Sequence, residues 1–158
     1  MTPAKADTHK ARKPKPIHHA SDYALDVLSG DDDLFRWFLL VYLFGKPIQA
    51  YVAAQTWKIF IERKLDNPWV ILDVNHRQLV RLLDEGKYKR YDETTARGLH
   101  ICMEQLIRDY EGSLMMMIED SQNEDELTKR LRTLYGVGPK TAEIFMRETS
   151  EFFARRVE

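Results

Sequence analysis

The stretch LYGVGPKT, from Leu134 to Thr141, predicts a tight turn between two helices. Upstream of it, leucines recur at the spacing of one helix face, at Leu127, Leu131 and Leu134. Downstream, a second stripe at helical spacing runs through Ala142, Phe145, Met146, Thr149, Phe152 and Phe153. The pattern therefore predicts a helix, a short turn and a second helix at about residues 123–157.

The residues of this turn suit the binding of an anion. Gly136 and Gly138 permit a positive φ and a close approach of the two helices, and Val137 between them can pack into their joint. Pro139 lacks an N–H group and suits the first turn of the second helix. Backbone amides at such a helix start point outward together and can bind a phosphate oxygen. The alternative is a glycine-containing connection between packed helices that binds no ligand.

The rest of the chain predicts a single all-α domain over residues 21–158. Its 158 residues are 44% hydrophobic, which suffices for one core. Asp31 to Asp33 precede the apolar stretch 34–44 and place acids at the N-terminus of a helix that we expect to be central and buried. A second helix is expected at 47–64, followed by a short turn after Asn67-Pro68.

Further helices are predicted from capping residues and from apolar spacing. Asn75 can cap a helix that ends at Gly86, and an apolar face at 96–110 predicts a long helix. Ser113 starts a short segment that contains three consecutive methionines. Asn123 and Glu126 form a variant of the capping box at the start of the helix that precedes the turn.

Charge is unevenly distributed along the chain. Residues 1–20 hold five of the 24 basic residues and one of the 25 acidic ones, which leaves 19 and 24 for the remainder. The first twenty residues are therefore expected to form a disordered basic tail on an acidic body. Because non-specific DNA affinity comes mainly from Lys and Arg, any DNA contact of the body must be local.

The single cysteine, Cys102, excludes an internal disulfide and any cluster or zinc site that needs several thiolates from this chain. We therefore expect no cofactor, no metal site and a reducing, cytoplasmic setting, nucleoid-associated if the source is bacterial. The longest apolar run, residues 34–44, is well short of the ~20 residues that cross a bilayer. No membrane partner is expected.

The string L-x-G-V-G-x-K-T-A of the turn resembles the helix-hairpin-helix of the endonuclease III-like superfamily of DNA base-excision glycosylases. The order of the other predicted helices is similar to the helical core of that family over residues 31–158. The resemblance implies double-stranded DNA as partner, held by its phosphate backbone at Gly136, Val137, Gly138, Lys140 and Thr141.

The resemblance also implies candidate catalytic residues. Lys140, directly before Thr141-Ala142, matches the lysine that forms a Schiff base in family members with lyase activity; its alternative role is a phosphate contact. The family's catalytic carboxylate falls on Glu158, an Asp-to-Glu change at the last residue. Lys46 or Gln49 stands where the family has a glutamine that fills the gap left by a flipped base. The family's C-terminal extension with four cysteines has no counterpart here.

These residues leave three functions open. The first is a minimal DNA glycosylase or abasic-site lyase that acts on damaged or abasic DNA in base-excision repair. The second is a non-catalytic helix-hairpin-helix module that binds DNA beside a protein partner. The third is a helical protein-interaction domain without DNA affinity, which the acidic body favours. In the first two, the basic and aromatic loop 87–91 is an additional candidate for contacts with phosphates or bases.

Overall fold

The computed structural model describes residues 18–157, and this part of the chain is all-α. It contains nine α-helices, two short 3-10 helices and no strand. In chain order these are η1 (Ala20–Tyr23), η2 (Val27–Ser29), α2 (Asp31–Leu43), α3 (Ala50–Glu62), α4 (Pro68–Asp73), α5 (His76–Glu85), α6 (Asp92–Tyr110), α7 (Leu114–Asp120), α8 (Glu124–Arg132), α9 (Pro139–Met146) and α10 (Ser150–Val157). Most of the predicted tail, residues 1–17, lies outside the described residues.

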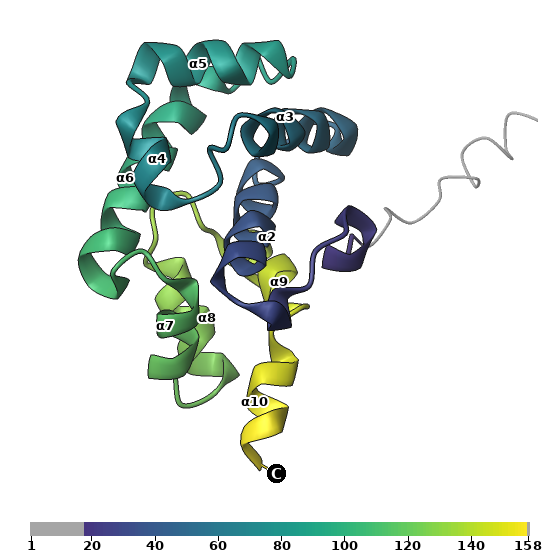
Figure 1. The fold of residues 1–158 in the computed structure, drawn as a ribbon, viewed down its shortest axis with the longest axis vertical. Helices are drawn as coiled ribbons and strands as arrows, with labels where there is room; N and C mark the ends of the chain where they lie inside the picture. The colour runs from purple at the N-terminus through teal and green to yellow at the C-terminus, as the bar shows by residue number, and fades with distance from the viewer. Residues whose placement is uncertain (1–17, 158) are drawn as a thin grey trace, which may run out of the picture.

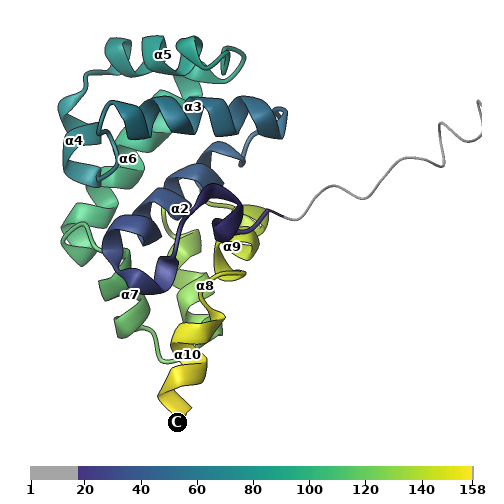
Figure 2. The same ribbon diagram turned by 45° about the vertical axis from the view of Figure 1, so that its right-hand side comes forward.

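Helix α2 is the centre of the core, as its apolar sequence predicts. From Leu34 to Leu43 only Arg36 is not buried, and Arg36 pairs with Asp33 and Asp66 at the surface. Figures 1 and 2 show α2 in the middle of the molecule with α9 beside it, α3 and α5 at one end, and α7, α8 and α10 toward the other. Helix α2 packs against α3, α7 and α9, so it connects the two ends.

The predicted caps at Asn75 and Ser113 are present. The Asn75 side chain accepts from the amide of Gln78 at 2.9 Å, and the Gln78 side chain accepts from the amide of Asn75 at 3.1 Å, which completes a capping box. The Ser113 hydroxyl accepts from the amide of Met116 at 2.9 Å and so starts α7. These caps form between near neighbours, which is why the sequence predicts them.

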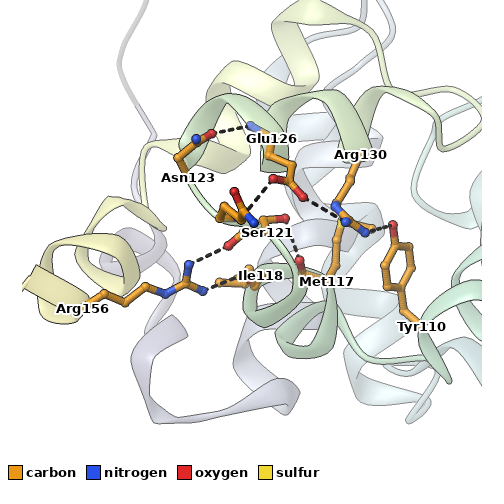
Figure 3. Close-up of polar contacts among 9 residues, drawn as sticks. Tyr110, Met117, Ile118, Ser121, Asn123, Glu126, Arg130 and Arg156 are labelled. Atoms are coloured by element: carbon orange, nitrogen blue, oxygen red, sulfur yellow. Dashed lines mark hydrogen bonds and ion pairs between the residues drawn. The ribbon is translucent and has the colours of Figure 1, made fainter.

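The predicted box at the start of α8 is only half formed (Figure 3). Asn123 Oδ1 accepts from the amide of Glu126 at 2.9 Å. The Glu126 carboxylate, however, accepts from the amide of Gln122 at 3.2 Å and pairs with Arg130 at 3.0 Å. The competing guanidinium, one helical turn away, draws the carboxylate toward α8.

The short turn predicted after Asn67 is wrong, because the chain forms helix α4 there. Asn67 Oδ1 accepts from the amide of Val70 at 3.1 Å, and Pro68 occupies the first helical position. Asn67 and Pro68 therefore start α4, whereas α3 already ends at Glu62. With only six residues, α4 is too short to show a helical period.

The second helix predicted after the LYGVGPKT turn is divided into α9 and α10. The amides of residues 147–149 bond three residues back instead of four, ending with Thr149 N to Met146 O at 3.1 Å. Trp37 Nε1 of α2 also donates to the Phe145 carbonyl at 3.3 Å, beside the Glu148 amide that donates to the same carbonyl at 3.2 Å. This tertiary contact accompanies the break, and the apolar spacing of the sequence does not reveal it.

Helix α10 is joined to the end of α7 by one side chain (Figure 3). The Arg156 guanidinium donates to the carbonyls of Ser121 at 2.6 Å and of Ile118 at 2.8 Å. A cation on the last carbonyls of a helix satisfies acceptors that have no partner inside that helix. Arg156 therefore holds the C-terminal segment against the α7–α8 joint.

Gly86 ends α5, but its role differs from that of a left-handed cap. Its φ is −83°, and the positive φ, 71°, belongs to Lys87. A Cβ at Gly86 would lie 2.7 Å from Thr56 Cα on α3. Gly86 is therefore required because the backbones of α3 and the end of α5 approach closely.

Tyr88 is fully buried in the loop after α5, and it gives the fold a sensitivity to alkaline pH. Its hydroxyl donates to the Leu43 carbonyl at 2.6 Å, and burial raises the pKa of Tyr88 to about 12. In the unfolded chain this phenol loses its proton near pH 10, while the folded protein still holds it. Its contribution to stability is therefore complete below about pH 10 and is lost as the pH rises toward 12.

We expect Tyr88→Phe to flatten this dependence. Between pH 9 and 11.5, its free energy of unfolding should fall by about 2 kcal/mol less than that of the wild type. Urea denaturation at a series of pH values measures both curves. Tyr51→Phe is the matched control, since Tyr51 is 65% exposed and should leave the slope unchanged. Parallel curves for wild type and Tyr88→Phe would contradict the prediction.

Candidate nucleic-acid interface

The turn between α8 and α9, residues 133–138, has a conformation that its two glycines allow. Gly136 has a φ of 85°, in the left-handed region that favours glycine. Val137 points inward with 6% of its surface exposed, and its amide donates to the Leu134 carbonyl at 3.1 Å. Gly138 is extended and precedes Pro139, the first residue of α9. The turn thus buries its valine and leaves its backbone at the surface.

Several amides of this turn have no acceptor in the described part of the chain. They belong to Gly136, Gly138, Lys140 and Thr141. Helices α4, α5, α7 and α8 each begin with an Asn or Ser side chain that accepts from a first-turn amide. Helix α9 begins with Gly138, which has no side chain to do so, and α2, α3 and α6 also begin without such a cap. The start of α9 therefore keeps its donors, and the positive end of its dipole, for another acceptor.

Tyr42 of α2 fixes the position of this turn. Its hydroxyl donates to the Tyr135 carbonyl at 3.0 Å. A Cβ at Gly136 would overlap that hydroxyl and lie 2.8 Å from Tyr42 Cζ, and a Cβ at Gly98 of α6 would lie 2.8 Å from the hydroxyl. Burial raises the pKa of Tyr42 well above its usual range, so the phenol stays a neutral donor. Tyr42 therefore holds the turn, α2 and α6 together.

Lys140 lies at the start of α9 with 75% of its side chain exposed. Its Nζ pairs with Glu143 at 3.1 Å, one turn further along the same helix. A lysine that attacks carbon must be partly deprotonated, which burial or neighbouring cations bring about, whereas a carboxylate partner favours the charged form. Lys140 therefore lies at the surface beside a carboxylate and not in an apolar pocket. Glu158, the predicted second catalytic residue, lies outside the described residues.

Two of the predicted DNA-binding side chains are buried. Val137 is in the core, and Thr141 is 6% exposed, with its Oγ1 3.0 Å from the place of a Cβ on Gly45. Only the backbones of these residues can contact a ligand at the surface. Thr141 instead packs the start of α9 against the loop between α2 and α3.

That loop carries the other two predicted residues, Lys46 and Gln49. Gln49 is exposed at the start of α3. Lys46 Nζ lies 5.8 Å from the centre of the Tyr91 ring, and the Arg90 guanidinium lies 5.5 Å from the same ring. The fold thus brings Lys46 beside the basic and aromatic loop 87–91, although the two are far apart in sequence.

A recess of about 180 Å³ opens between the α2–α3 loop, the first half of α6 and the α8–α9 turn. Lys46, Arg97, Tyr135 and Gly136 are among the residues that line it. Arg97 and Tyr135 were not predicted as functional residues. The sequence feature that could have indicated this place is Gly98. A glycine inside a long helix lowers the stability of that helix, so it suggests that another group packs closely against the backbone there. Here the rings of Tyr42 and Tyr135 do so.

Comparison with protein-family models, with curated proteins and with solved structures gives no match to this chain. Within residues 18–157, no group of three or more His, Cys, Asp or Glu side chains is arranged to hold a metal ion. No helix in the same range is long and apolar enough to span a bilayer.

Proposed function

We propose that this protein binds duplex DNA through the phosphate backbone, with α8, the turn and α9 acting as a helix-hairpin-helix. The observation that supports this most is the start of α9, where the amides of Gly138, Lys140 and Thr141 have no acceptor among the described residues and no side chain caps them. A phosphate oxygen satisfies such donors and interacts favourably with the helix dipole.

The surrounding charges support the same assignment. Lys140 is exposed beside these amides, and Lys46 lies on a loop that contacts α9 through Gly45 and Thr141. The chain as a whole has a net charge of −1, so the attraction to DNA is local. We therefore expect an affinity that falls with added salt, with the shallow slope of a few phosphate contacts.

Gly138 offers a test in which stability and DNA binding change in opposite directions. Its extended backbone suits any residue, and a Cβ there would meet nothing within 4 Å. In Gly138→Asn, the new side chain can accept from the first-turn amides, which keeps or raises stability. The same bond occupies the phosphate donors, so we expect duplex affinity to fall about tenfold, equal to ~1.4 kcal/mol.

Fluorescence anisotropy with a labelled duplex at low salt measures the affinity, and urea denaturation measures the stability. Gly138→Ala is the matched control, because it adds a Cβ without a cap and should bind within about twofold of the wild type. If Gly138→Asn binds DNA as tightly as Gly138→Ala, the amides are not the phosphate site. If the wild type binds no duplex at low salt, the proposal fails and the protein-interaction alternative gains support.

Lyase activity at abasic sites is a second candidate function, favoured by the position of Lys140 directly before Thr141-Ala142 at an exposed helix start. The exposure of the Lys140 Nζ favours a phosphate contact instead, in which a phosphate would compete with the Glu143 carboxylate. A role in base-excision repair is compatible with both functions, DNA binding and lyase activity.

Borohydride trapping on an abasic-site duplex separates the two roles of Lys140. As a phosphate contact, Lys140→Arg should bind like the wild type and Lys140→Ala more weakly, with no trapped adduct for any of the three proteins. As a nucleophile, the wild type should give an adduct that both variants lose, because an arginine forms no Schiff base under these conditions.

A further inference from the structure

The recess beside the turn has a composition that selects for an anion. Lys46 and Arg97 line it, and its lining includes no carboxylate. Neither cation forms an ion pair with any carboxylate of the described residues; the arginines that do form ion pairs, Arg36, Arg63, Arg108, Arg130, Arg147 and Arg155, lie elsewhere in the fold. Two cations without acidic partners, at one concave site, leave positive charge for a ligand.

The size of the recess limits what can enter it. An engineered cavity of about 150 Å³ is filled by one benzene molecule. At about 180 Å³, the recess has room for a phosphate group, and it is open to the surface on one side. Tyr135, half exposed, provides one wall, with its ring against Gly98. A ring in this position can contact the sugar that carries the phosphate.

A terminal phosphate fits this site better than a phosphate within a strand. An internal phosphodiester is flanked by two sugars and carries one negative charge. The strand therefore holds it along a protein surface and does not insert it into a recess. A phosphate at a strand end projects from the chain and carries about −1.5 to −2 charges near pH 7. That charge matches the two cations, Lys46 and Arg97, that line the recess.

We propose that the recess binds the terminal phosphate of a DNA strand break, while the α8–α9 turn holds the adjoining backbone. This inference rests on the proposed DNA-binding function and adds a substrate class, nicked or gapped DNA with a phosphate end. Gly136 lines the recess and also belongs to the turn, so the two sites share one wall and can engage a single strand.

The test compares three duplexes that differ only at one position: intact, nicked with a terminal phosphate, and nicked with a terminal hydroxyl. Breaks with the phosphate on the 5′ side and on the 3′ side are both included. Anisotropy should show at least about fivefold tighter binding to one phosphate end than to the matching hydroxyl end, which is ~1 kcal/mol. Arg97→Gln should remove this preference and leave intact-duplex affinity within about twofold.

Arg81→Gln is the matched control, since Arg81 is also exposed and without an ion pair among the described residues, but lies on α5 outside the recess. It should keep the preference. Equal binding of phosphate and hydroxyl ends, with normal intact-duplex binding, would overturn this inference and leave the proposed function standing. A preference that survives Arg97→Gln and disappears in Gly138→Asn would place the phosphate at the turn and also overturn it. Absence of all DNA binding would overturn both proposals.

Discussion

Gly136→Ala should lower the free energy of unfolding by about 3 kcal/mol and abolish duplex binding. The backbone contributes part of this loss, because a φ of 85° strains any residue with a Cβ. Packing contributes the rest, because the added Cβ would overlap the Tyr42 hydroxyl, which is buried and bonded to the Tyr135 carbonyl. The turn must move, and the amides at the start of α9 move with it.

Gly138→Ala is the matched control for this prediction, since it adds the same methyl group two residues away. Its φ of −94° is ordinary, and its Cβ would meet nothing within 4 Å. Urea denaturation followed by circular dichroism should therefore separate the two variants clearly. Equal stabilities would show that the turn is free to shift and that Tyr42 does not fix it.

The double variant Tyr42→Phe, Gly136→Ala separates the steric contribution from the backbone strain. Removing the hydroxyl leaves the ring, whose Cζ would still lie 2.8 Å from the new Cβ, so only part of the stability should return. Tyr42→Phe alone also removes the hydrogen bond to the Tyr135 carbonyl. The coupling energy between positions 42 and 136 should therefore be non-zero, as expected for residues in contact.

Trp37→Ala should lower the free energy of unfolding by about 4 kcal/mol, because it empties a large volume in the middle of the core. The Trp37 side chain is completely buried in α2. Its Nε1 also donates to the Phe145 carbonyl, so the variant removes the bond that accompanies the break between α9 and α10. We therefore expect looser packing of α9 on α2 and weaker DNA binding.

Trp69→Ala provides the comparison, since Trp69 is 56% exposed and its loss should cost less than about 1 kcal/mol. Circular dichroism is the suitable probe, because both variants alter tryptophan fluorescence. Hydrogen exchange in Trp37→Ala should increase most in α9 and α2. A Trp37→Ala protein within about 1 kcal/mol of the wild type would contradict the central position of α2.

Local signals predicted much of this fold. The apolar run that became α2 predicts a buried helix, and the caps at Asn75 and Ser113 form between residues three apart. Where prediction failed, a distant partner, a short element or, at Glu126, a competing side chain one helical turn away was involved. Helix α4 is too short for a period, and the continuous helix expected after Pro139 breaks where Trp37, more than a hundred residues earlier, reaches the Phe145 carbonyl.

In the candidate site, too, the local features were predicted from the sequence and the features that depend on distant residues were not. The string from Leu134 to Thr141 predicted the turn as a place for phosphate, which stays a prediction; among the described residues, the amides of Lys140 and Thr141 in the first turn of α9 have no acceptor. The recess was not predicted, because Lys46, Arg97 and Tyr135 come from three segments that meet only in the folded chain. The sequence also did not predict the surroundings of Lys140, namely its exposure and its pairing with Glu143, which bear on whether it can act in catalysis.

The sequence by itself therefore determined the all-α class, the central helix and the turn at Gly136 to Gly138, because each depends on interactions between residues within one or two helical turns. The tertiary structure decided that Gly86 and Gly98 serve close packing, that Tyr42 fixes the turn, and that Lys46 and Arg97 face one recess. Such contacts depend on how helices cross, and crossing is set by the packing of the whole core.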